Sequence, residues 1–251
     1  MPNITDKLNQ LHQRIQQITK KVNQNPNDIT LLAVSKGQSA DAIQSAYKHG
    51  QRHFGENYLQ EALEKQQQLS ELSDICWHFI GPIQSNKTQK VAKNFDWVHT
   101  VDRIKVAERL NAVRSDHPTP LNICLQVNIN GEESKSGVST NEVKELAHAV
   151  AKLPNLTLRG LMAIPKNNQS EEKQRASFAA VAQLLSKLKN SSPQLATLDT
   201  LSMGMSADLE AAIAEGATII RVGTAIFGPR HYPEKAETQK ISQIKNTPHQ
   251  D

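Results

Sequence analysis

The chain has 251 residues, of which 37% are hydrophobic and 22% charged, and its formal net charge is +4. This length and composition are typical of one large globular domain and exclude a wholly disordered chain. No apolar run approaches the roughly 18 residues of a membrane helix, and residues 1–10 lack the apolar core of a signal peptide, so we expect a cytoplasmic protein without membrane attachment.

The basic charge does not point to nucleic acid, because the lysines are scattered and interleaved with carboxylates. The two cysteines, Cys76 and Cys124, fall in separate apolar segments, and we expect small core residues, not a disulfide or a catalytic thiol. Neither cysteine lies in a recognisable His and Cys cluster. The sequence therefore predicts no metal site.

The first element is an amphipathic helix, because Leu8, Leu11, Ile15, Ile18 and Val22 recur at spacings of three and four. We expect this helix to pack as a lid across the floor of the fold, in preference to binding a partner. The segment NPND at 25–28 then ends it.

Short apolar runs then alternate with helical stretches, and Gly50 and Gly216 stand where helix C-caps are expected. The runs predicted as strands are 29–35, 52–55, 76–80, 97–101, 121–129, 158–164, 198–203 and 218–223. Eight strands with helices between them predict a single α/β domain over residues 1–230, a closed (β/α)₈ TIM barrel with an extra N-terminal helix. An open doubly wound sheet is the alternative, although no GxGxxG follows the first strand. The polar segment 231–251 is expected to be a flexible tail.

The mouth of such a barrel lies at the carboxyl ends of its strands, and Lys36 directly follows the first. Partial burial lowers the pKa of a lysine and frees its amine to attack an aldehyde. Taken alone, Lys36 is more simply a lysine whose ammonium reaches water.

Two small-residue turns, LSMGMS at 201–206 and RVGTAIFG at 221–228, follow the seventh and eighth strands. Phosphate sites in these barrels lie at this place, where backbone N–H groups, hydroxyls and helix N-termini face an anion. An amine and a phosphate cradle in one mouth are what a pyridoxal phosphate site requires.

Four further residues are considered at the mouth. Arg221 could face the cofactor's pyridine nitrogen or form a salt bridge inside the mouth. Asn57 is placed to bond the cofactor's phenolic oxygen, or to begin the next helix. His78 is more simply a hydrogen-bonded residue inside the barrel than a general base, and Met162 is expected to serve packing.

The segments LLAVSK, HFGENYLQEALEK, WHFIGPIQSNK, HTVDR, VNINGEESKSGV, RGLMAIP, LSMGMSADLEAAIAEGAT and RVGTAIFG closely resemble the pyridoxal phosphate homeostasis family, also called alanine racemase N-terminal-like. The resemblance covers most of residues 30–228. It implies a fold type III barrel that holds pyridoxal 5′-phosphate as a Schiff base on Lys36. The other cofactor-binding residues that it implies are Asn57, Ser202, Met203, Gly204, Arg221, Gly223 and Thr224.

Family members commonly read Ser-Lys-Thr-x-Pro where this chain has Ser35-Lys36-Gly37-Gln38-Ser39, so a role for a second lysine in this loop does not transfer. Lys135 matches a family lysine linked to cofactor release. The resemblance implies a carrier and regulator in vitamin B6 and amino-acid balance, with no catalytic residues, with apo-enzymes as possible recipients, and monomeric more readily than dimeric. An amino-acid racemase or lyase is the alternative, and an aldolase on sugar phosphates is a third hypothesis.

Overall fold

A computed structural model describes residues 3–132, 136–166 and 170–229. Eight parallel strands close into a barrel in chain order, because β1 pairs with both β2 and β8. The strands are β1 (Thr30–Val34), β2 (His53–Glu56), β3 (Cys76–Phe79), β4 (Trp97–Val101), β5 (Leu121–Val127), β6 (Leu156–Ala163), β7 (Thr200–Ser202) and β8 (Ile219–Val222). All eight predicted strands are confirmed, and the open sheet is excluded.

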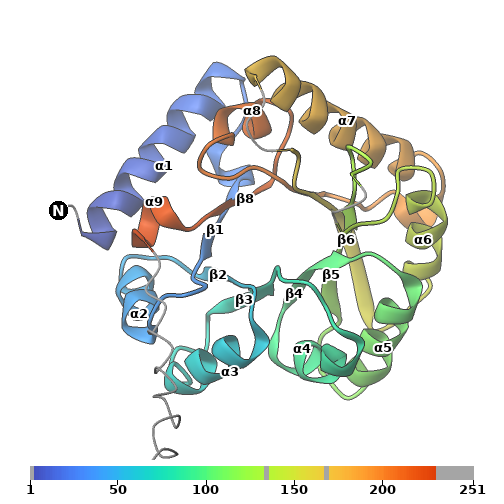
Figure 1. Cartoon of the computed structure of the whole chain (residues 1–251), viewed down its shortest axis with the longest axis horizontal. Coiled ribbons are helices and arrows are strands. Elements are labelled where there is room, and N and C mark those ends of the chain that lie inside the picture. Colours follow the sequence, from blue (N-terminus) through green and yellow to red (C-terminus); the bar gives the residue numbers. More distant parts are fainter. Residues whose placement is uncertain (1–2, 133–135, 167–169, 230–251) are drawn as a thin grey trace, which may run out of the picture.

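Helices form a ring around the barrel (Figure 1). They are α2 (Ala40–Lys48), α3 (Leu59–Gln68), α4 (Thr88–Asn94), α5 (Ile104–Arg114), α6 (Val143–Val150), α7 (Glu171–Lys189), α8 (Leu209–Ala214) and α9 (Thr224–Phe227), with 3₁₀ turns at Pro26–Asp28, Ser85–Lys87 and Pro193–Leu195. The predicted C-caps are confirmed, since Gly50 and Gly216 follow helices with φ of +89° and +91°. In the part of the chain that the structure describes, no helix is long and apolar enough to cross a membrane.

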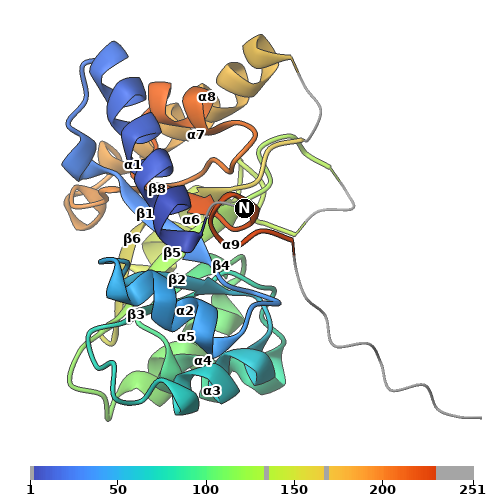
Figure 2. The same cartoon turned by 90° about the vertical axis from the view of Figure 1, so that its left-hand side faces the viewer.

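Helix α1 (Ile4–Lys21) begins at a capping box formed by Asn3 and Asp6. The prediction that it lies across the barrel floor is wrong. It stands in the outer ring and contacts α2, α8 and α9 (Figures 1 and 2). The reason is that α9, the helix that follows β8, has only four residues, and the apolar face of α1 covers the wall that α9 leaves open.

The apolar core lies between the strands and the helices, whereas the barrel interior holds several fully buried polar side chains. His78 on β3, His99 on β4, Ser202 on β7 and Arg221 on β8 are all less than 9% exposed. Buried polar groups require hydrogen-bond partners, and these four find them in one another. This polar column ends at Arg221, directly below the mouth.

Candidate functional site

A cavity of about 500 Å³ opens at the carboxyl ends of the strands. It is lined by Val34, Lys36, Asn57, Ile80, Met162, Ile164, Lys166, Gln174, Met205, Ser206, Ala207, Asp208, Arg221, Gly223 and Thr224. Five of the eight predicted cofactor residues therefore line this cavity, whereas Ser202, Met203 and Gly204 do not. Residues from the first and the last strands meet here because the barrel is closed.

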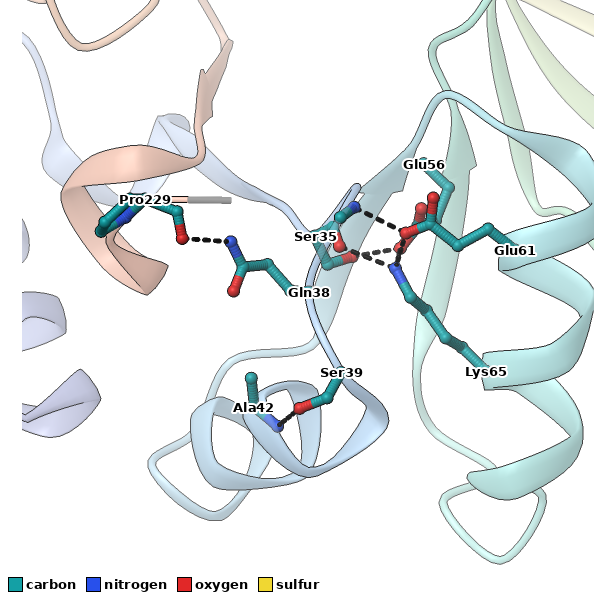
Figure 3. A network of polar contacts seen from close by, with 9 residues as sticks. Ser35, Gln38, Ser39, Ala42, Glu56, Glu61, Lys65 and Pro229 are labelled. Atoms are coloured by element: carbon teal, nitrogen blue, oxygen red, sulfur yellow. Dashed lines mark hydrogen bonds and ion pairs between the residues drawn. The ribbon is translucent and has the colours of Figure 1, made fainter. Parts of the chain in front are cut away.

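The backbone around Lys36 is fixed by a second lysine, Lys65, on α3 (Figure 3). Lys65 Nζ donates to the Ser35 carbonyl oxygen over 2.7 Å and to carboxylate oxygens of Glu56 and Glu61 over 2.8 and 2.5 Å. The Gly37 N–H donates to the same Glu61 oxygen over 2.6 Å. The backbone on both sides of Lys36 is thus held by one hydrogen-bond network, which restricts the position of the Lys36 Cα.

The centre of this network is a buried ion pair. The side chains of Glu56 and Lys65 are 0% and 6% exposed. Burial raises the pKa of Glu56 above its ordinary value, and the nearby Lys65 ammonium opposes that shift. Ser35 Oγ also donates to Glu56, over 2.6 Å. Sequence analysis did not assign this role to Glu56, because its partner Lys65 is nine residues further on.

Arg221 lines the bottom of the cavity and is held there by three hydrogen bonds. Its guanidinium donates to the Ser202 carbonyl oxygen over 2.5 Å, to Ser202 Oγ over 3.0 Å and to the Ala163 carbonyl oxygen over 3.0 Å. Burial lowers the pKa of Arg221 to about 10, with Asp208 acting in the opposite direction. The group therefore stays cationic at neutral pH while it lines the cavity. Among the described residues it is held by these hydrogen bonds and not by the alternative, a salt bridge.

The loop after β7 reaches the cavity at residues further along the chain than expected. Ser202 lies on β7 itself, where its hydroxyl bonds to His99 and Arg221 inside the barrel. Gly204 turns the chain with a φ of +93°, and Ser206 then reaches the cavity wall. In this arrangement the Ser202 hydroxyl bonds to the arginine, and Ser206 is the loop hydroxyl that lines the cavity. A direct contact of Ser202 with a phosphate stays a prediction.

The remaining predicted residues suit a phosphorylated aromatic aldehyde. Gly223 passes so close to β1 that an added Cβ would lie 3.1 Å from the Val34 carbonyl oxygen, and Thr224 brings a hydroxyl beside it. Asn57 lines the cavity, and its Oδ1 is buried and has no hydrogen-bond partner among the described residues, so this amide has bonding capacity to spare. A buried polar atom of this kind is expected where a ligand completes the site.

Three lining residues with charged or amide side chains were missed. Lys166 and Gln174 enter the wall beyond β6, and Asp208 does so beyond β7. Burial raises the pKa of Asp208, whose carboxylate accepts a hydrogen bond from the Met205 N–H over 2.6 Å. Position after a strand's carboxyl end would have marked Lys166, which comes three residues beyond β6.

The other expectations have mixed outcomes. His78 is buried within the barrel and hydrogen-bonded to His53 and His99, so it does not reach the cavity as a general base would. Met162 is 1% exposed, yet it also lines the mouth. Lys135 and the tail 231–251 lie outside the described residues.

These features define a class: a closed barrel that offers an anchored lysine, a cationic floor and a small-residue loop to one ligand. A family model described as the alanine racemase N-terminal domain matches residues 7–231. The chain is 51% identical over 232 residues to the pyridoxal phosphate homeostasis protein of Pseudomonas aeruginosa, a match that covers 92% of this chain and 98% of that one. The corresponding protein of Escherichia coli strain K12 is 48% identical over 237 residues, or 94% of this chain and 100% of that one. The chain therefore belongs to the pyridoxal phosphate homeostasis protein family, whose barrel is the alanine racemase N-terminal domain.

Solved structures agree with this assignment. PipY of Synechococcus elongatus PCC7942, determined with PLP bound, matches with a TM-score of 0.80 and 38% identity over 90% of this chain and 100% of that one. Alanine racemase of Clostridium difficile matches with a TM-score of 0.65 and 14% identity, over 89% of this chain but 57% of the racemase. The second likeness shows the fold alone.

Proposed function

We propose that this protein holds pyridoxal 5′-phosphate as a Schiff base on Lys36 and serves the cell's cofactor balance without a catalytic reaction of its own. The observation that carries the proposal is the convergence of Lys36, Asn57, Arg221, Gly223 and Thr224 on one cavity. Close relatives named for pyridoxal phosphate homeostasis, and a 38% identical structure with PLP bound, support it.

Each residue has a distinct task in this proposal. The Lys36 amine would hold the cofactor's aldehyde carbon as a Schiff base, with the carbonyl oxygen released as water, and the Lys65 network keeps the backbone on both sides of Lys36 in place. Asn57 binds the ring's phenolic oxygen, and Ser206, Gly223 and Thr224 surround the phosphate. Bound pyridoxal phosphate supplies an aldehyde for exchange with primary amines and a ring that withdraws electrons.

Arg221 favours a carrier over an enzyme. A guanidinium below the pyridine nitrogen opposes protonation of that nitrogen, because two positive charges would lie together in a buried place. The ring is then a weaker electron sink than one paired with a carboxylate. We place a racemase or lyase activity second for this reason.

The assignment of Lys36 is tested by borohydride reduction of the loaded protein. We expect a near-ultraviolet or visible absorbance band that reduction fixes onto Lys36, as located by peptide mass analysis. Lys36→Ala removes the fixed adduct. Lys166→Ala is the matched control, because Lys166 lines the same cavity and should leave the adduct intact. An adduct that survives in Lys36→Ala contradicts the assignment. If the protein binds no pyridoxal phosphate at all, the aldolase hypothesis is favoured instead.

Two further assays separate carrier from enzyme. In deuterated water with amino acids, a carrier exchanges the α-proton no faster than free cofactor does, whereas a racemase exchanges it far faster. Loaded protein is also mixed with an apo-enzyme beside a trap for free pyridoxal phosphate. Activation that the trap does not reduce shows direct transfer to a recipient enzyme.

A further inference from the structure

A second cluster of ligand-type side chains lies at the opposite end of the barrel from the cavity. His53 and Cys76 begin the neighbouring strands β2 and β3 and are paired in register. His78 comes two residues after Cys76 and so points to the same face of β3. Within the described residues, His53, Cys76 and His78 each offer a ligand atom, and the three atoms lie within 4.8 Å of one another.

The distances inside the cluster suit one metal ion. His53 Nδ1 lies 3.0 Å from His78 Nε2, and Cys76 Sγ lies 3.4 Å from the same nitrogen. A tetrahedral zinc ion with bonds of about 2.0–2.1 Å to nitrogen and 2.3 Å to sulfur holds its ligand atoms about 3.3–3.7 Å apart. These two separations therefore need to open by only a few tenths of an ångström to admit the ion.

We propose that His53, Cys76 and His78 form a zinc site at the barrel floor, with water as the fourth ligand. Two imidazole nitrogens and one thiolate are a donor set that zinc prefers, and calcium or magnesium would require oxygen ligands instead. Binding displaces the proton of the Cys76 thiol to solvent, and the His53 proton moves to its other ring nitrogen, so one proton is released for each ion bound.

The surroundings favour a cation that arrives from solvent. His53 and Cys76 are both half-buried, so an ion can reach them from solvent at this end of the barrel. His78 is fully buried. The Asp96 carboxylate, held by the Trp77 N–H over 2.8 Å, acts on both His53 and Cys76 with a negative field. The Trp97 ring stacks on the His78 imidazole at 5.4 Å between centroids and limits how that imidazole can turn.

The cluster also continues into the barrel. His78 Nδ1 lies 2.9 Å from His99 Nε2, and His99 Nδ1 lies 2.8 Å from Ser202 Oγ, which accepts a bond from Arg221. A zinc ion on His78 Nε2 requires the proton on Nδ1, which then donates to His99. Metal-bound histidines usually have such a second-shell partner, and it orients the ring.

The expectation of no metal site arose because the ligands do not form a sequence motif. His53 stands 23 residues before Cys76, and Cys76-Trp77-His78 lacks the two-residue spacing of common zinc knuckles. Only the pairing of β2 with β3 brings His53 to the cysteine.

The test uses tag-free, cofactor-loaded protein titrated with Co²⁺, then with Zn²⁺ as competitor. We expect one Co²⁺ per chain, with a thiolate-to-cobalt absorption band and visible bands that Zn²⁺ abolishes. In Cys76→Ser the thiolate band is lost, and the affinity for Co²⁺ falls by more than the roughly 10–100-fold typical of a second-shell change. Cys124→Ser is the matched control, because Cys124 is buried on β5 and should leave binding unchanged.

Folding of each variant is checked by its borohydride-reducible cofactor band, which depends on the opposite end of the barrel. His53→Gln provides a second variant that keeps the thiol and should also weaken Co²⁺ binding. Absence of stoichiometric Co²⁺ binding overturns the proposal, and so does a thiolate band that persists in Cys76→Ser. In the first case the three groups form a metal-free hydrogen-bonded cluster.

Discussion

Lys65 and Ser35 are 30 residues apart in sequence, yet the Lys65 ammonium donates to the Ser35 carbonyl oxygen over 2.7 Å. Ser35 is the residue before the proposed cofactor lysine. Lys65 and Lys36 thus have different roles at this end of the barrel. Lys65 is committed to an ion pair with Glu56 and Glu61, while Lys36 lines the cavity.

Lys65→Met should destabilise the protein by about 3–5 kcal/mol, because removing one partner of a buried ion pair leaves the Glu56 charge uncompensated. Urea unfolding of the cofactor-free protein measures this loss. The fraction of protein with a reducible cofactor band should fall too, since the Ser35 carbonyl loses its donor. Lys173→Met, an exposed change on α7, serves as control and should alter neither quantity. Equal effects of the two changes would contradict the network's role.

The pH dependence of stability should carry the signature of Glu56. Burial raises its folded pKa above the unfolded value near 4.5, so the folded state binds more protons than the unfolded state between the two. The contribution of Glu56 is therefore fully present below pH 4.5 and is lost as pH rises through the folded pKa. Glu56→Gln cannot titrate. The difference in unfolding free energy between the wild type and Glu56→Gln should thus decline across this window, and a flat difference would refute the assignment.

Ser202 and Ser206 should have separable effects on cofactor binding. Ser206→Ala should weaken binding of pyridoxal phosphate by about tenfold or more, the value of a hydrogen bond to a charged group, and leave binding of pyridoxal unchanged. Ser202→Ala releases one bond to Arg221 and should weaken both ligands to a similar degree. Fluorescence titration with the two ligands gives the four affinities. A loss confined to pyridoxal phosphate in Ser202→Ala would show that Ser202 is a direct phosphate ligand.

Gly204→Ala should cost about 2–4 kcal/mol, from a strained positive φ and an overpacked contact. An added Cβ at Gly204 would lie 2.4 Å from the Ala212 Cβ. Gly50→Ala is matched to it, since Gly50 has a similar φ of +89° but nothing within 4 Å of an added Cβ. It should cost only the strain, about 1–2 kcal/mol. Thermal denaturation compares the two, and equal losses would show that the contact with Ala212 relaxes freely.

Much of the fold follows from local pattern. Each strand is a short apolar run bounded by turn residues, and Gly50 and Gly216 mark helix ends because they adopt a positive φ that other residues avoid. The position of α1 could not be predicted in this way. Its apolar stripe shows that one face is buried, but the site of burial depends on the short length of α9.

The site, too, has features that follow from the sequence and features that depend on tertiary contacts. Lys36, Asn57, Arg221, Gly223 and Thr224 could be placed at strand ends from the sequence alone. They were expected to lie together because the carboxyl ends of parallel strands share one edge of a barrel. Tertiary structure alone decided that Ser202 bonds to Arg221, that Lys65 holds Ser35 and that His53 meets Cys76. Those contacts depend on strand register and on which elements become neighbours. The periodicity of apolar residues along the chain predicts neither the register nor the neighbours.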